Sequence, residues 1–168
     1  TINFRINRLI KNGFVKGFYT IINTSKLGWY YTKLYIKFKN ITPEKEKELF
    51  EYVSRQAHIS YLASIEGYYD CMILVMVKSS SDMIEFQDGF MKLYGQYIQQ
   101  KDLVIFLTTH RLNARFMYEG KERKDWFYPM KLQDYKLDEI EKGILDIIST
   151  NGRMPLIEIA QRLGIDHK

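Results

Sequence analysis

The chain has 168 residues, of which 46% are hydrophobic and 27% charged, a composition typical of folded domains and not of disordered segments. The longest uninterrupted apolar run, Cys71–Val77, is far shorter than the roughly 18 residues of a membrane span, so we expect no membrane contact. The single cysteine excludes an internal disulfide framework and favours a reducing, cytoplasmic location, and one Cys with three separated His offers no zinc-ligand spacing.

The net charge of +5 is distributed unevenly along the chain. Residues 1–39 contain eight basic side chains and no acid, whereas the remainder contains 17 basic and 20 acidic side chains. This asymmetry indicates a polyanionic partner for the basic end, although a solvated lysine face gives the same composition. The eight basic residues are Arg5, Arg8, Lys11, Lys16, Lys26, Lys33, Lys37 and Lys39.

The first residues follow a helical pattern. Apolar residues recur at helix spacing between Ile2 and Ile10, and Gly13 predicts the helix end because glycine adopts the left-handed conformation without steric cost. Residues 14–22 are then predicted to form a short β ribbon that bends at Gly17.

The central part of the chain, residues 29–110, shows the order of a split βαβ, or ferredoxin-like, unit, which is βαββαβ. Two helices cover only one face of the four-stranded sheet that this order predicts. The other face carries Tyr31 and Tyr35, so we expect it to be buried in a dimer or under other segments. Strands are expected at 29–38, 59–66, 69–78 and 103–109, and helices at 42–56 and from Asp82, which has capping-box spacing to Glu85.

The last part of the chain returns to helical periodicity. Residues 126–129 are aromatic and form either an anchor packed on the sheet or a partner contact. From Leu137 a helix is predicted to run to 151–152, and a second helix extends from Pro155 to Gly164. Two helices joined by a short Gly-containing turn form the front of a helix-turn-helix.

Three motifs, in this order and spacing, resemble those of the Lrp/AsnC family of transcription regulators. Residues 1–9 and 13–18 resemble the family's recognition helix and the wing that follows it. The sequence Glu-Gly-Tyr-Tyr-Asp at 66–70 is similar to the family's G-x-Y-D turn. Residues 137–164 resemble the start of the same DNA-binding domain.

This resemblance implies an α+β protein whose ferredoxin-like βαββαβ effector domain is flanked by partial winged helix-turn-helix elements. A standard member has one complete DNA-binding domain followed by one effector domain. Two explanations fit the different order here: the chain is a fragment of a tandem protein, or its incomplete DNA-binding ends are vestigial. We favour a fragment. Without the first two helices of the N-terminal element, this fragment is expected to bind DNA poorly on its own, whereas the full-length protein is expected to shift a duplex in a salt-sensitive way. The implied divisions are a recognition helix and wing at 1–24, an effector domain at 25–112, a linker with an aromatic anchor at 113–135, and two helices of a second helix-turn-helix at 136–168.

The resemblance also implies double-stranded DNA as a partner of the first helix. Asn and Arg side chains pair with base edges, and Lys side chains suit phosphates. Arg5 alternatively braces the domain through an acid, and Phe4 either meets a thymine methyl group or packs on neighbouring helices. The implied DNA-binding residues are Asn3, Arg5, Asn7, Arg8, Lys11 and Lys16.

The ferredoxin-like domain resembles the family's sensor of amino acids or related metabolites, which pairs into homodimers through its sheets and assembles further. The implied effector-binding residues are Glu66, Gly67, Tyr69 and Asp70. Gly67 permits close backbone approach and Asp70 can receive an α-amino group. The alternative is that Gly67 and Asp70 only form the turn and bond its amides.

An enzymatic function is not expected, because the chain has no nucleophile elbow, P-loop, dinucleotide fingerprint or metal-ligand set, and no cofactor is implied. The alternatives are a siroheme-decarboxylase-like enzyme, which shares the two-domain plan, and a sensing or oligomerisation module that does not bind DNA. Residues 61–76 contain no His or Arg of the kind that such enzymes use for the tetrapyrrole.

Overall fold

The computed structural model describes residues 1–111, 125–129 and 131–166, and the chain divides into two compact units. One unit, here the helical unit, combines the two ends of the sequence, Thr1–Asn23 and Tyr135–Lys168. The other, here the sheet unit, is continuous and contains Thr24–Asp134. No helix in the described part of the chain combines the length and the apolar character that crossing a bilayer requires.

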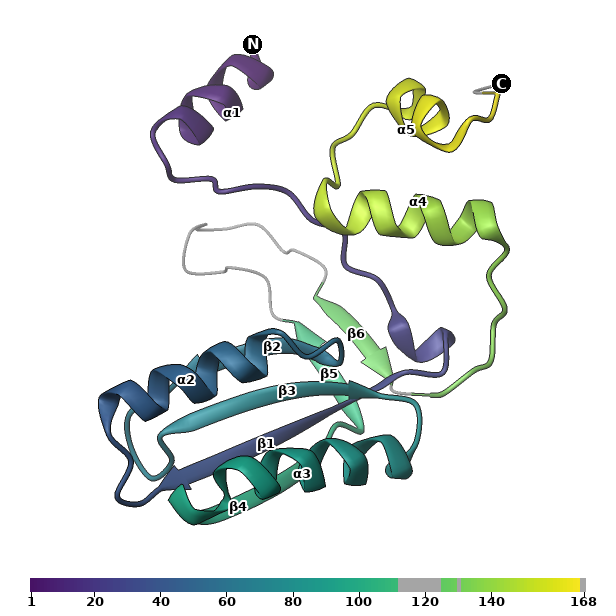
Figure 1. Cartoon of the computed structure of the whole chain (residues 1–168). Coiled ribbons are helices and arrows are strands. Elements are labelled where there is room, and N and C mark those ends of the chain that lie inside the picture. Colours follow the sequence, from purple (N-terminus) through teal and green to yellow (C-terminus); the bar gives the residue numbers. More distant parts are fainter. Residues whose placement is uncertain (112–124, 130, 167–168) are drawn as a thin grey trace. The chain divides into compact units, whose positions relative to one another are not determined.

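The sheet unit contains four antiparallel strands in the order β2-β3-β1-β4, with two helices on one face (Figure 1). Together with the chain order βαββαβ, this is the ferredoxin-like topology that the sequence predicts. The elements are β1 (Tyr30–Phe38), α2 (Pro43–Ser54), β2 (Ile59–Ser64), β3 (Cys71–Val77), α3 (Ser80–Tyr94) and β4 (Ile98–Ile105), with short 3₁₀ helices η1 (Thr24–Lys26) and η2 (Gly95–Tyr97).

The core lies between the sheet and the two helices. Alternate residues of β1 and β3 face it, and the register places Leu34 opposite Ile73 and Ile36 opposite Cys71, all fully buried. Thr32 is also buried in this layer, and its hydroxyl donates to the carbonyl of Val75. The helices contribute Leu49, Val53, Met83, Phe90 and Tyr94 to the core.

The opposite face of the sheet, here the open face, carries no helix of the sheet unit (Figure 1). The side chains that β1 and β3 contribute to it are half-buried, whereas Val104 of β4 is exposed. The central strand β3 is apolar on this face as well, as the continuous hydrophobic run predicts. Lys33 lies opposite Leu74 of β3 and Val104 of β4. The open face is formed chiefly by Tyr31, Lys33, Tyr35, Met72, Leu74, Met76, Asp102 and Val104.

Helix caps explain where the helices of this unit begin. Thr42 caps α2, with Pro43 at the first helical position as predicted. The predicted capping pair of α3 was wrong, because Ser79 is the N-cap and Asp82 is the third helical residue that bonds back to it. The fourth strand begins at Ile98 and not at residue 103, because η2 ends the helix earlier than its periodicity suggests.

A short hairpin pair follows the sheet, with β5 (Thr108–Arg111) antiparallel to β6 (Trp126–Pro129). The Phe127 ring lies 4.6 Å from the imidazole of His110 between centroids, and 56% of Phe127 is exposed. This residue of the predicted aromatic anchor therefore contacts its own hairpin and not the core. The predicted linker residues 113–124 lie outside the described part of the chain.

In its described residues, 1–23 and 135–166, the helical unit contains three helices with clear ends, as predicted. Helix α1 (Ile2–Lys11) is followed by Gly13 with φ of 76°, and α5 (Leu156–Leu163) ends at Gly164 with φ of 65°. Helix α4 (Glu139–Thr150) begins with a capping box between Asp138 and Glu141. The predicted ribbon at 14–22 was wrong, because this segment contains no strand.

Candidate DNA-binding and effector-binding sites

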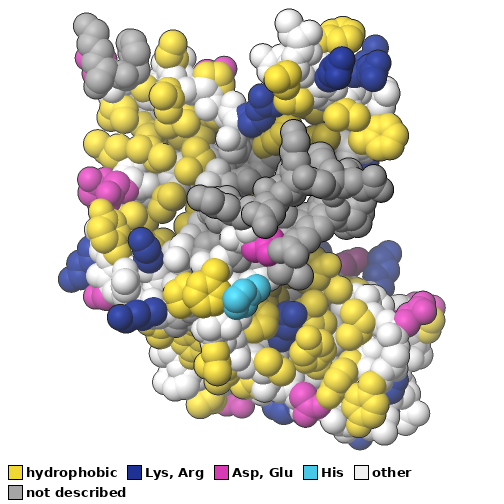
Figure 2. Space-filling view, turned by 180° about the vertical axis from the view of Figure 1, so that it is seen from behind, with side chains coloured by type: hydrophobic (Ala, Val, Ile, Leu, Met, Phe, Trp, Pro, Cys, Tyr) yellow, Lys and Arg dark blue, Asp and Glu magenta, His cyan; other side chains and the backbone are white. Residues whose placement is uncertain are grey.

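Helix α1 presents to solvent a polar face that includes one apolar residue, Phe4. It contains no acidic residue, and none of its residues is buried. At 100° per residue, Asn7, Lys11 and Arg8 lie in the middle of this face, with Asn3 and Arg5 at its two borders. Basic side chains lie among hydrophobic ones in the part of the space-filling view that α1 forms (Figure 2).

The structure leaves all six residues predicted to bind DNA exposed, including Lys16 in the segment after α1. Phe4, which is 66% exposed, lies between Lys11 and Arg8 on the polar face by helical spacing. The amide, guanidinium and ammonium groups on one helix face can donate hydrogen bonds to base edges and phosphates. The arrangement therefore has the chemistry of a DNA-reading helix.

The predicted effector turn lies between β2 and β3. Its ends are joined by a hydrogen bond from the Ile65 amide to the Asp70 carbonyl, at 2.9 Å. Gly67 has φ of 136°, a conformation that favours glycine, and no atom lies within 4 Å of the place where a Cβ would be. Glu66 is exposed and Tyr69 is half-buried.

The Asp70 carboxylate is engaged by β1. One oxygen accepts from the Lys37 ammonium at 2.7 Å, and the other accepts from the Phe38 amide at 2.7 Å. Burial acts to raise the pKa of Asp70, but these two hydrogen bonds and the charge of Lys37 outweigh it and hold the pKa below its usual value. The carboxylate therefore has structural partners, but they are not the amides of the turn that the structural alternative names, because Lys37 and Phe38 both lie on β1. The sequence did not predict the ion pair with Lys37.

A polar cluster on β4 holds Tyr69. The Tyr69 hydroxyl donates to the Asp102 carboxylate, which also accepts from the Gln100 amide at 2.9 Å. The hydrogen bond to Asp102, with smaller effects of burial and nearby charge, raises the pKa of Tyr69 to about 12. The Tyr69 ring packs on Tyr35 at 5.3 Å between centroids, so the turn is joined to the open face of the sheet.

A hollow of about 370 Å³ lies beside the turn, at the end of β1. Of the four predicted effector residues only Asp70 lines it. Sequence reasoning missed Lys39, Glu46 and Ser64 as site residues, and all three also line the hollow. These residues come together only because of the position of α2 on the sheet, and a local sequence pattern does not predict that position.

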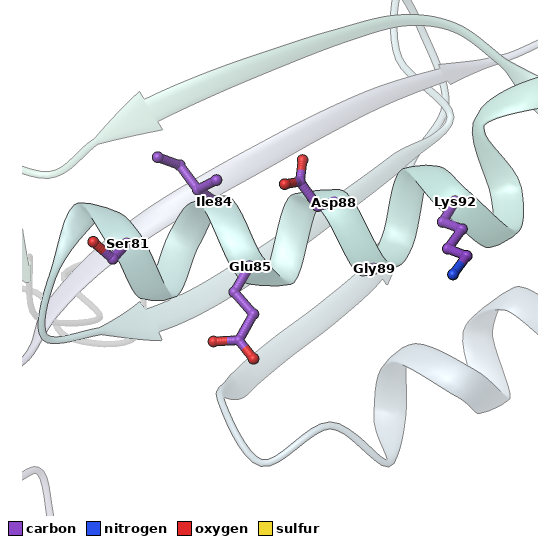
Figure 3. Close-up of a pocket in the computed structure, with 6 residues that line it drawn as sticks. All are labelled: Ser81, Ile84, Glu85, Asp88, Gly89 and Lys92. Atoms are coloured by element: carbon purple, nitrogen blue, oxygen red, sulfur yellow. The ribbon is translucent and has the colours of Figure 1, made fainter.

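A larger depression of about 660 Å³ follows α3, but its lining comes from this one helix (Figure 3). The Asp88 and Glu85 carboxylates point to different sides of the helix, and Lys92 lies a turn further along (Figure 3). These groups do not converge on a common point, so we assign no site there. Among the described residues, no cluster of three or more His, Cys, Asp or Glu could hold a metal ion.

Comparison with known proteins shows what the sequence and the fold are similar to. Residues 137–167 match a sequence family described as winged helix-turn-helix DNA-binding. HTH-type transcriptional regulators of Pyrococcus furiosus (PF1231) and Pyrococcus horikoshii (PH0140) are 28% and 29% identical to the chain over 86 residues, 51% of the chain in each case. The chain spans 57% and 53% of the length of these two relatives.

Solved structures of similar fold are also found. An AsnC family transcriptional regulator from Agrobacterium tumefaciens has a TM-score of 0.53 at 16% identity, covering 61% of this chain and 67% of that one. AsnC of E. coli has a TM-score of 0.51 at 15% identity, with coverage of 63% and 70%. The regulator NMB0573 of Neisseria meningitidis, solved as an L-Met complex, has a TM-score of 0.53 at 12% identity, with coverage of 63% and 68%. The resemblance to Lrp/AsnC regulators seen in the sequence motifs is confirmed at the level of the fold.

Proposed function

We propose that the chain is part of a DNA-binding transcription regulator of the Lrp/AsnC type. The observation that carries the proposal is the exposed, acid-free polar face of α1, in the same compact unit as helices that match a winged helix-turn-helix family. The fold of the sheet unit and the regulator names of the relatives support the same function.

On this proposal α1 enters the major groove. Asn7 and Arg8, in the middle of the polar face, read base edges, while Lys11 and Lys16 contact phosphates. Phe4 lies on the same face and is placed to meet a thymine methyl group. Asn3 and Arg5, at the borders of the face, contribute at its edges.

The test is a gel-shift titration against a library of genomic fragments, followed by measurements on the selected duplex. Lys11→Ala should weaken binding of all duplexes and reduce the slope of log affinity against log salt by about one. Arg8→Ala should instead relax specificity at one base pair, at a cost of about 1–3 kcal/mol. Lys92→Ala, on α3, is the matched control. Absence of duplex binding at low salt would contradict the proposal.

The sheet unit then serves as the dimerising and sensing part. The half-buried apolar side chains of the open face support pairing of two sheets. The hollow at the end of β1 supports amino-acid binding, since Lys39 suits a carboxylate and Glu46 suits an α-amino group. Gly67 leaves open space at the turn beside the hollow, and Glu66 and Tyr69 belong to the same turn. NMB0573, of similar fold, was solved with L-Met.

Calorimetric titration and size-exclusion chromatography with each of the twenty amino acids test the sensing role. We expect one amino acid or a small group to bind and change the assembly, and Lys39→Ala to weaken that binding at least tenfold. Lys101→Ala, whose ammonium contacts Gln87 away from the hollow, is the control. If none of the amino acids gives heat or changes elution, the effector proposal fails while the DNA proposal stands.

The regulator names of the relatives support a role other than catalysis. The siroheme-decarboxylase alternative predicts tight tetrapyrrole binding, which a haem or siroheme titration measures directly. We expect no shifted Soret band. A stoichiometric complex would contradict the regulator proposal.

A further inference from the structure

The backbone of the segment after α1 meets the backbone at the end of α4. The Thr20 amide donates to the Ile148 carbonyl at 3.2 Å, and the Gly152 amide donates to the Phe18 carbonyl at 2.9 Å. The Arg153 guanidinium lies 4.8 Å from the centroid of the Phe18 ring. These contacts join opposite ends of the sequence within the helical unit.

Gly152 fits this contact closely. A Cβ built on Gly152 would lie 3.0 Å from the Thr20 hydroxyl oxygen, 3.2 Å from the Thr20 nitrogen and 3.2 Å from the Tyr19 carbonyl carbon. Two of these three atoms are backbone, which cannot rotate away. A Cβ at position 152 would therefore require the segment at 18–20 to move away by a few tenths of an ångström, and a bulkier side chain would require more.

The contact also satisfies a helix end. The last four carbonyls of a helix have no partner within the helix, and that of Ile148 belongs to this set in α4. The Thr20 amide supplies the missing donor. In return the contact holds the segment that leads to α1. Helix α1 itself buries none of its residues, and with ten residues it is too short to be stable alone in water.

We infer that the end of α4 and the turn at 151–153 form a docking surface for residues 18–20 of the same chain, so that both ends of the sequence build one DNA-binding unit. The charges of the two parts support this. Residues 1–23 carry four bases and no acid, whereas residues 135–166 carry six acids and four bases. The docking of residues 18–20 does not depend on the proposed function. The role of this docking in DNA binding rests on the proposed function.

Disulfide trapping tests the docking. The test pair is Thr20→Cys combined with Gly152→Cys. The sulfur of the first cysteine would lie near the observed position of the Thr20 hydroxyl oxygen, which is 3.0 Å from a Cβ at position 152. This distance is close to the separation between the sulfur of one cysteine and the Cβ of the other in a disulfide. Cys71 can stay, because burial raises the pKa of its thiol to about 12 and keeps it unreactive. The matched control pair is Gly17→Cys with Gly152→Cys, since no atom lies within 4 Å of a Cβ on Gly17.

We expect an intrachain disulfide in the first pair, seen on a non-reducing gel as a faster monomer that dithiothreitol abolishes, and little in the control pair. Disulfide-linked dimers in place of the monomer product would assign the docked segment to a second copy and overturn the inference. Equal trapping in both pairs, or none in the first at native far-UV circular dichroism, would also overturn it.

The role in DNA binding is tested with the selected duplex. Gly152→Val should weaken binding at least tenfold although it lies outside α1, and the oxidised Thr20→Cys/Gly152→Cys protein should keep its affinity. Gly89→Val, on α3 of the sheet unit, is the control. If the unmodified chain binds no duplex, the proposed function fails while trapping still decides the docking. Unchanged affinity of Gly152→Val would overturn the single-unit inference.

Discussion

Asp70 was predicted from a sequence motif to bind an effector, but in the structure its carboxylate bonds to residues of β1. Its carboxylate accepts hydrogen bonds from the Lys37 ammonium and the Phe38 amide, both at 2.7 Å. Asp70→Asn keeps the shape but removes the charge. We expect it to lower the free energy of unfolding at neutral pH by about 1 kcal/mol, a value reduced for the partial exposure of the pair. Urea denaturation measures this difference.

The pH dependence of this difference follows from the lowered pKa of Asp70. The stabilisation is complete well above the unfolded-state pKa of about 3.9 and is lost as the pH falls through the lower folded-state value. The original chain and Asp70→Asn should therefore differ at pH 7 and converge below pH 3. Asp88→Asn, at an exposed position on α3, is the control and should change stability little at either pH. A constant difference down to low pH would assign the effect to packing.

The sequence predicts the turn around Asp70 but not the partner of its carboxylate. Gly67 and Asp70 are only three positions apart in sequence, and their types alone indicate a turn. Lys37 lies 33 positions away on another strand, and only the register of β1 against β3 brings it to Asp70. Lys39 and Glu46 were not predicted to line the hollow for a similar reason, because tertiary structure and not local sequence brings them together.

At the scale of elements, the N-terminus of α3 depends on Ser79. Its hydroxyl accepts from the Asp82 amide, and the Asp82 carboxylate accepts from the Ser79 amide. Ser79→Ala should lower the free energy of unfolding by about 1 kcal/mol, because the helix loses its N-cap. The neighbouring substitution Ser81→Ala should leave stability unchanged or raise it slightly, since alanine favours the helix interior. Thermal unfolding of both variants measures this, and equal losses would contradict the assigned cap.

The elements that local chemistry defines were predicted well. Helix α4 has a capping box and α5 ends at Gly164, and both lie where the periodicity places them. Elements whose ends depend on tertiary partners were predicted less well. The segment at 14–22 pairs with the end of α4 and forms no ribbon, and β4 begins at Ile98 where β1 supplies its partner. Neither partner is visible in a local window of sequence.

At the scale of the whole molecule, the open face of the sheet unit predicts self-association. Leu74 lies near its centre, opposite Lys33 of β1 and Tyr61 of β2. Leu74→Glu should raise the dimer dissociation constant at least a hundredfold, because pairing would bury a charge. The monomer should stay folded, since the new carboxylate lies directly opposite the Lys33 ammonium in the register.

Sedimentation velocity over a range of concentrations distinguishes this loss of association from unfolding, when it is combined with far-UV circular dichroism. Ile84→Glu is the matched control, since Ile84 is 57% exposed on α3, on the helix-covered side of the sheet. It introduces the same charge at an apolar surface position that the proposed pairing leaves in solvent. Because pairing through the open faces would leave both helices outside, the control should associate like the original chain. Association unchanged by Leu74→Glu, or lost equally in both variants, would place the contact between copies somewhere other than the open face.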